Sequence, residues 1–117
     1  MNQNQSVGKY GEDRAAEFLK RLGYELLDRN WRSSAGEIDL IAKDGSCLVF
    51  AEVKTRTRLA CGHPFEAITA AKVRRMRTLA SQWCQAHKLG VVEVRLDAIS
   101  VLIRDGRVTI EHLKQVY

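Results

Sequence analysis

The chain contains the stretch Gly36-Glu-Ile-Asp-Leu-Ile-Ala-Lys-Asp-Gly-Ser-Cys-Leu-Val-Phe-Ala-Glu-Val-Lys-Thr55, in which two largely apolar runs flank Asp44-Gly45. Apolar residues of the β-branched and aromatic kinds favour strands, and Asp-Gly is a preferred pair in two-residue hairpin turns. The stretch therefore predicts two neighbouring antiparallel strands, residues 36–43 and 47–55, joined by a turn.

Helices and further strands are predicted on both sides of this hairpin. Apolar side chains at three- and four-residue steps indicate an amphipathic helix from Gly8 to Leu22, which ends at Gly23. Residues 24–32 are expected to form a strand, and a longer helix is expected from Glu66 to His87. Two more strands, residues 92–103 and 107–113, flank a second Asp-Gly pair. The order α-β-β-β-α-β-β predicts an α/β fold in a single domain over residues 8–117, after a flexible tail at residues 1–7.

The composition is that of a folded protein, since 45% of the 117 residues are hydrophobic and 28% are charged. The apolar runs are too short to span a membrane and the N-terminus lacks the pattern of a signal peptide, so a cytoplasmic location is expected. Three cysteines, Cys47, Cys61 and Cys84, without a Cys-x-x-Cys pair favour reduced thiols. The net charge of +5 and the four cations between Lys72 and Arg77 indicate an anionic partner, unless that segment is simply a solvated helix face.

The residues with chemical potential lie on the first hairpin. Glu52 and Lys54 share one face of their strand with Phe50, while the opposite face of the hairpin, including Ile38, is apolar. A turn of two or four residues would put Asp39 opposite Phe50 on the charged face, whereas a three-residue turn would put it on the other face. Half-buried carboxylates repel one another, and Mg²⁺ or Mn²⁺ would relieve that repulsion. This hypothesis requires Asp39, Glu52 and Lys54 to meet in one pocket.

Two further glutamates are candidates for the same site. Glu12 lies at the edge of the buried stripe of the first helix and is predicted to point inward, although a glutamate near a helix start is also favoured by the helix dipole. Glu37 precedes Asp39 by two residues on the same strand. It is either a further ligand or a residue of the rim.

A family resemblance extends over nearly the whole chain. The chain resembles the YraN-type family of small bacterial predicted endonucleases in the segments Gly8-Lys-Tyr-Gly-Glu-Asp-Arg-Ala-Ala16, Gly36-Glu-Ile-Asp-Leu-Ile41, Val49-Phe-Ala-Glu-Val-Lys-Thr-Arg56 and Glu66-Ala-Ile-Thr-Ala-Ala-Lys72. More distantly it is similar to the PD-(D/E)xK superfamily, which includes Holliday junction resolvases. The resemblance implies a restriction-endonuclease-like αβββαβ core, a mixed central sheet flanked by helices, and an extra C-terminal strand. Ile38 stands where that superfamily often has proline.

The resemblance also implies roles for single residues. Asp39 and Glu52, with the carbonyl of Val53, would bind Mg²⁺ or Mn²⁺, and Lys54 would orient a water molecule for phosphodiester hydrolysis. Glu12 matches the helical glutamate of resolvase-like members. The partner would be nucleic acid, with DNA favoured, and we expect a chain this small acting on two strands to dimerise. The backbone phosphates flanking the cut are expected to contact Arg56, Lys72 and Arg75, whereas Arg74 and Arg77 are expected to point outward.

Two alternatives remain open. The stronger one is a module of the same fold that binds nucleic acid without cutting it. The weaker one is a zinc site formed by Cys61, His63, Cys84 and His87, whose spacings differ from those of common zinc modules. Three other residues are assigned to structure: Trp31 and Trp83 to packing, and Asp97 to an ion pair with Arg95 or to a supporting shell.

Overall fold

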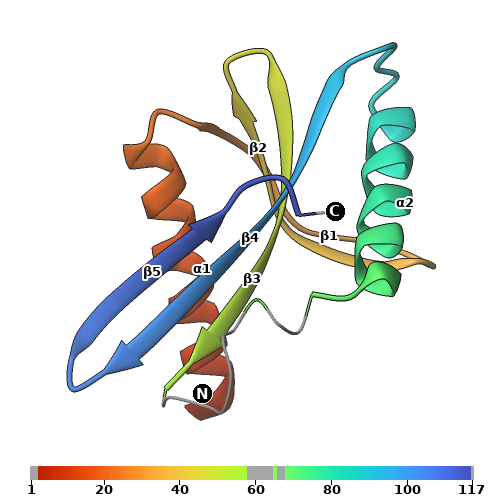
Figure 1. Ribbon diagram of the computed structural model, residues 1–117. Helices are drawn as coiled ribbons and strands as arrows, with labels where there is room; N and C mark the ends of the chain where they lie inside the picture. Colours follow the sequence, from red (N-terminus) through yellow and green to blue (C-terminus); the bar gives the residue numbers. More distant parts are fainter. Residues whose placement is uncertain (1–2, 58–64, 66–67, 117) are drawn as a thin grey trace.

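The fold is a five-stranded sheet with one helix packed on each face (Figure 1). The computed structural model describes residues 3–57, 65 and 68–116. Its elements are, in chain order, α1 (Gln3–Arg21), β1 (Glu25–Ser33), β2 (Gly36–Asp44), β3 (Cys47–Arg56), α2 (Ala70–Ala86), β4 (Glu93–Arg104) and β5 (Arg107–Leu113). The predicted order of helices and strands is confirmed.

The sheet is mixed, as predicted, and its strands lie in the order β1-β2-β3-β4-β5. β3 and β4 are parallel, whereas every other neighbouring pair is antiparallel. A parallel pair needs a crossover, and α2 lies within the connection from β3 to β4 (Figure 1). Within the described part of the chain, no helix is both long and apolar enough to cross a bilayer.

The first helix starts earlier than predicted. α1 begins at Gln3, so residues 3–7 are helical where the sequence predicted a flexible tail. Glutamine is a good helix former, and nothing between Gln3 and Gly8 interrupts the turn. At the other end, Gly23 takes a φ of +93° and its N–H bonds to the carbonyl of Lys20, which confirms the predicted stop.

The second helix starts later than predicted. Thr69 caps α2, because its hydroxyl accepts the backbone N–H of Lys72 at 3.1 Å, and the helix runs from Ala70. The predicted first residue, Glu66, lies outside the described residues. His87 is the C-cap, close to the predicted end.

Two apolar clusters occupy the two faces of the sheet. The α2-side cluster consists of Ile38, Ile41, Leu48, Phe50, Met76, Leu79, Ala80, Trp83, Leu96, Ala98 and Val116. The α1-side cluster consists of Ala15, Ala16, Leu19, Tyr24, Leu40, Ala42, Val49, Ala51, Ile99 and Val101. Burial of both faces explains why β2 and β3 read as nearly continuous apolar runs.

The assignments of Trp83, Trp31 and Asp97 to structure are confirmed. Trp83 is buried in the α2-side cluster and Trp31 packs against it. Asp97 is fully buried and accepts bonds from Arg95 at 2.9 and 3.0 Å and from His112 at 2.7 Å. A buried carboxylate held by two such partners stabilises the fold.

Candidate functional site

The candidate site lies where β2 and β3 stop pairing. Their ladder runs from Asp44, opposite Cys47, to Leu40, opposite Ala51, and ends there. The turn therefore has two residues, as one of the predicted options required, but they are Gly45 and Ser46 rather than the predicted Asp44 and Gly45. The predicted partner of Asp39 is wrong, however, because Phe50 pairs with Ile41.

Asp39 is the residue of β2 just beyond the end of the backbone ladder to β3. Its side-chain Oδ2 accepts the backbone N–H of Val53 at 2.7 Å, so a side-chain bond follows the last backbone pair of the two strands. Val53 separates Glu52 from Lys54 in the sequence. The Asp39 carboxylate is thus hydrogen-bonded to the backbone of the middle residue of the Glu-x-Lys motif.

The two-residue alternation of β2 breaks at Asp39. Leu40 and Ala42 belong to the α1-side cluster, as regular alternation requires, but Ile38 belongs to the α2-side cluster with Ile41. The prediction that Ile38 shares a face with Leu40 and Ala42 is therefore wrong. Because the alternation does not pass through Asp39, turn length alone does not decide where its carboxylate points.

The neighbouring strand breaks at the same level. Arg29 reaches α1, whereas Trp31 packs on the α2 side, and Asn30 between them has a left-handed φ of +53°. The β1–β2 register pairs Arg29 with Leu40 and Trp31 with Ile38, so Asn30 faces Asp39 across the two strands. In both strands the side chains therefore change faces of the sheet at this level, and Asn30 and Asp39 lie on the side of α1, beside Glu12.

The three hairpin residues do not all line one hollow. Asp39 and Lys54 line a hollow of about 350 Å³, completed by Gly8, Glu12, Val53 and Thr55. Glu52 lines an adjoining recess with Lys72, and Lys54 borders that recess too. The expectation of a single pocket is therefore met for Asp39, Lys54 and Glu12 but not for Glu52, with Lys54 common to both spaces.

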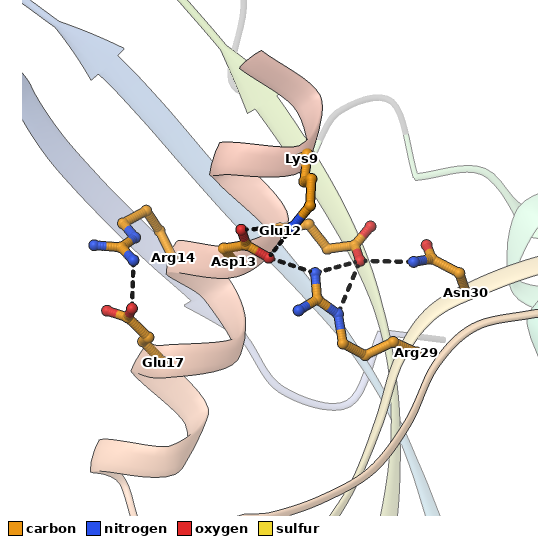
Figure 2. A network of polar contacts seen from close by, with 7 residues as sticks. All are labelled: Lys9, Glu12, Asp13, Arg14, Glu17, Arg29 and Asn30. Carbon is orange, nitrogen blue, oxygen red and sulfur yellow. Dashed lines mark hydrogen bonds and ion pairs between the residues drawn. The ribbon is translucent and has the colours of Figure 1, made fainter. Parts of the chain in front are cut away.

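Glu12 points inward, as predicted. Its side chain is 16% exposed, and its Oε1 accepts three bonds: from Arg29 Nη2 at 2.7 Å, Arg29 Nε at 3.1 Å and Asn30 Nδ2 at 3.0 Å (Figure 2). The dipole explanation is wrong, because α1 begins at Gln3 and Glu12 lies well beyond its first turn.

The electrostatics of the hollow are unfavourable to an ionised Asp39. Burial raises the pKa of Asp39 to about 6, the bond from the Val53 N–H opposes that rise, and the negative charges of Glu12, Glu37 and Glu52 add to it. A carboxylate held under these conditions gains from a nearby cation. The hard oxygen donors of Asp39 and Glu52 suit Mg²⁺ or Mn²⁺.

A cation here would need more than side-chain ligands. Across residues 3–57, 65 and 68–116, no three His, Cys, Asp or Glu side chains are grouped closely enough to hold a metal. Mg²⁺ commonly takes one or two carboxylates and fills its remaining positions with water and substrate phosphate. Asp39, Glu52 and a backbone carbonyl such as that of Val53 are donors of the kind that this ion takes, although the two carboxylates line different spaces.

Basic side chains border the site on the α2 side. Lys72 lies 3.7 Å from Glu52, and the side chain of Arg75 lies against the backbone of Gly36 at the β1–β2 turn. Arg56 ends β3 and is half-buried. The predicted phosphate contacts thus lie on two elements, α2 and β3, and of the three only Lys72 lines the recess. Arg74 is exposed on α2, as expected.

Two residues of the site were not predicted, and one candidate is reassigned. Arg29 and Asn30 bind Glu12, yet no motif or periodicity in the sequence marks them. Glu37 forms an ion pair with Arg32 at 3.1 Å and is exposed, which corresponds to the rim option.

The zinc alternative gains no support from the two ligands that the structure describes. Cys84 packs against the α2-side cluster, and the ring of His87 stacks on Trp83 at 3.9 Å between centroids. Cys61 and His63 lie outside the described residues. Cys47 and Cys84 are free thiols, as expected.

Comparison with known proteins identifies the family. The model of the family described as Uncharacterised protein family UPF0102 matches residues 11–101, which include Glu12, Asp39, Glu52 and Lys54. The chain belongs to the UPF0102 family. This match confirms the YraN-type resemblance seen in the sequence motifs.

Individual UPF0102 proteins match over nearly their full lengths. The chain is 53% identical over 109 residues to the UPF0102 protein of Renibacterium salmoninarum, covering 92% of each chain. It is 47% identical over 117 residues to that of Beutenbergia cavernae, covering 99% of each, and 45% identical over 118 residues to that of Rhodococcus opacus, covering 100% of each. The family assignment therefore applies to nearly the whole chain, whereas the names of the family and of these relatives state no activity.

Proposed function

We propose that this UPF0102 protein is a metal-dependent endonuclease that hydrolyses phosphodiester bonds in nucleic acid, with DNA as the favoured substrate. One observation carries the proposal: Asp39 is half-buried beside Glu12 and Lys54, bonded to the backbone between Glu52 and Lys54, and destabilised by the carboxylates around it. Within the described residues the neighbouring carboxylates each have a cationic partner, whereas Asp39 accepts only the Val53 N–H. A divalent cation would offset the charge of this half-buried carboxylate.

The residues divide into ligands, a water-orienting group and phosphate contacts. Asp39, Glu52 and the carbonyl of Val53 would hold Mg²⁺ or Mn²⁺, which supplies an activated water and neutralises phosphate oxygens. Lys54 lines the hollow together with Asp39, and its ammonium would orient that water or stabilise the charge of the transition state.

The basic residues would hold the nucleic acid beside these ligands. Lys72 on α2 lines the recess next to Lys54, Arg75 lies one turn further along α2, and Arg56 ends β3. Contacts of this kind position a backbone without reading its sequence. The net charge of +5 would add affinity by releasing counterions from the polyanion.

A non-catalytic nucleic-acid-binding module is the second candidate, and a specific observation favours it. Two of the carboxylates already have cationic partners within the protein, since Glu12 is bonded to Arg29 and Glu52 lies 3.7 Å from Lys72. If these pairs persist with nucleic acid bound, the basic rim would bind phosphate while the carboxylates remained neutralised.

Cleavage assays separate the two candidates. Labelled duplex, branched and single-stranded DNA would be incubated with the wild type in Mg²⁺, Mn²⁺ or EDTA, beside Glu52→Gln and the control Glu93→Gln, an exposed glutamate at the other end of the β3–β4 pair. We expect metal-dependent cutting that Glu52→Gln lowers by about 100-fold or more and that Glu93→Gln leaves intact. A wild type that binds DNA but never cuts it in either metal would support the binding module instead.

A further inference from the structure

Asn30 has an unusual backbone conformation beside the candidate site. Its φ of +53° lies in the left-handed region, which non-glycine residues seldom adopt, although asparagine tolerates it better than most. The residue is exposed, so burial of its side chain does not compensate for this conformation. Backbone strain of this kind tends to be kept where it places a functional group.

This conformation directs the Asn30 amide to one oxygen of Glu12. Asn30 Nδ2 donates to Glu12 Oε1 at 3.0 Å, and Arg29 donates to the same oxygen at 2.7 and 3.1 Å (Figure 2). No donor in residues 7–57, 65 or 68–116 bonds to Oε2. Among these residues the carboxylate is held by Oε1 alone, and Glu12 lines the hollow that it shares with Asp39 and Lys54.

Anchoring of β1 to α1 does not require this arrangement. Arg29 Nη2 also bonds to Asp13 Oδ1 at 2.8 Å, and Asp13 in turn pairs with Lys9 at 3.0 Å (Figure 2). That contact already joins the strand to the helix. The Asn30 amide adds a third bond to an oxygen that Arg29 already holds, so it chiefly restricts how the Glu12 carboxylate can turn.

We infer that Arg29 and Asn30 are positioning residues that hold Glu12 by Oε1 and keep its Oε2 directed to the hollow beside Asp39. The inference rests on the proposed function and deepens it, because it gives Glu12 an indirect part: its Oε2 would orient a water on the cation that Asp39 and Glu52 would hold. Residues that hold such a group commonly matter about 10- to 100-fold for metal affinity or turnover.

Asn30→Gly is the decisive variant, because glycine accepts a left-handed φ and removes only the amide. The matched control is Asp105→Gly, which replaces another non-glycine residue of positive φ, at +50°, in the β4–β5 turn. Arg29→Lys keeps the charge but loses the two-pronged contact. Each purified variant would be compared with the wild type in melting temperature, kcat and KM on DNA, and calorimetric titration with Mn²⁺ in the absence of DNA.

We expect Asn30→Gly to melt within roughly 3 °C of the wild type, to keep its KM for DNA, and to lose about tenfold in Mn²⁺ affinity or kcat. Arg29→Lys should lose at least as much, and Asp105→Gly should match the wild type in turnover and Mn²⁺ binding. A merely structural Asn30 would instead change the melting temperature and leave Mn²⁺ affinity and kcat alone.

Cleavage by the wild type separates the positioning role of Arg29 and Asn30 from the nuclease proposal. If the wild type cuts, Glu52→Gln does not, and both Asn30→Gly and Arg29→Lys cut and bind Mn²⁺ like the wild type, the positioning role is refuted while the nuclease proposal stands. If the wild type neither cuts DNA nor binds Mn²⁺, the nuclease proposal itself fails and the positioning role fails with it.

Discussion

Replacing Asp39 by asparagine should stabilise the protein at neutral pH. Burial and nearby carboxylates raise the pKa of Asp39 from 3.8 to about 6, which corresponds to roughly 3 kcal/mol of unfavourable free energy in the ionised folded state. Asparagine keeps a neutral oxygen for the Val53 N–H, and the pKa of about 6 already includes the favourable effect of that bond on the ionised carboxylate. The net expectation is therefore a gain of about 3 kcal/mol in the free energy of unfolding.

The pH dependence of this gain follows from the direction of the shift. Below 3.8 both the folded and the unfolded wild type carry a protonated Asp39, so the penalty is absent. Between 3.8 and about 6 only the unfolded state releases the proton, and the wild type loses stability as the pH rises. Above about 6 the penalty is complete and constant. The advantage of Asp39→Asn should therefore be small at pH 4 and full at pH 8.

Urea denaturation in EDTA at several pH values measures this difference. Asp13→Asn is the opposite-sign control, because hydrogen bonds from Lys9 and Arg29 lower the pKa of Asp13. Removing that partly exposed charge should cost less than about 1 kcal/mol at neutral pH. Two results would show that burial does not raise the pKa of Asp39. One is an Asp39→Asn protein less stable than the wild type at pH 8, and the other is a gain in stability that does not shrink between pH 6 and pH 4.

Three stability predictions can be checked in the same urea titrations. Asp97→Asn should cost about 3 kcal/mol, because it removes the buried partner of Arg95, and a loss below about 1 kcal/mol would show that the pair is dispensable. Gly11→Ala should cost about 2 kcal/mol, since its Cβ would come within 2.1 Å of Thr55 Oγ1 and push α1 from β3; an unchanged midpoint would contradict this close approach. Leu79→Ala should cost about 3 kcal/mol by opening a cavity in the α2-side cluster, and a neutral result would mean that the cluster refills the space.

Much of the fold was predictable because its signals are local. The β2–β3 hairpin follows from apolar runs around Asp44-Gly45, and the end of α1 follows from Gly23 after a basic last turn. The helix starts were less predictable. The start of α2 depends on which hydroxyl accepts an N–H, and Thr69 competes with other residues ahead of the apolar stripe.

The candidate site was predictable in its members but not in its arrangement. Glu12, Asp39 and Lys54 were selected from residue type and spacing, and they line one hollow. The separate recess of Glu52 and the bonds that Arg29 makes to Glu12 were not foreseen. Strand periodicity assumes regular alternation, and here two strands rotate together.

Residue order along the chain was enough to specify the elements, their sequence and the candidate carboxylates of the site, because each depends on neighbours a few positions away. The direction of each carboxylate depended on contacts between distant segments: β1 against α1 through Arg29 and Asn30, and β2 against β3 through Asp39 and Val53. A side chain at a break in a strand follows the partner that binds it rather than the period of its own strand, so only the assembled fold decided where the charges meet.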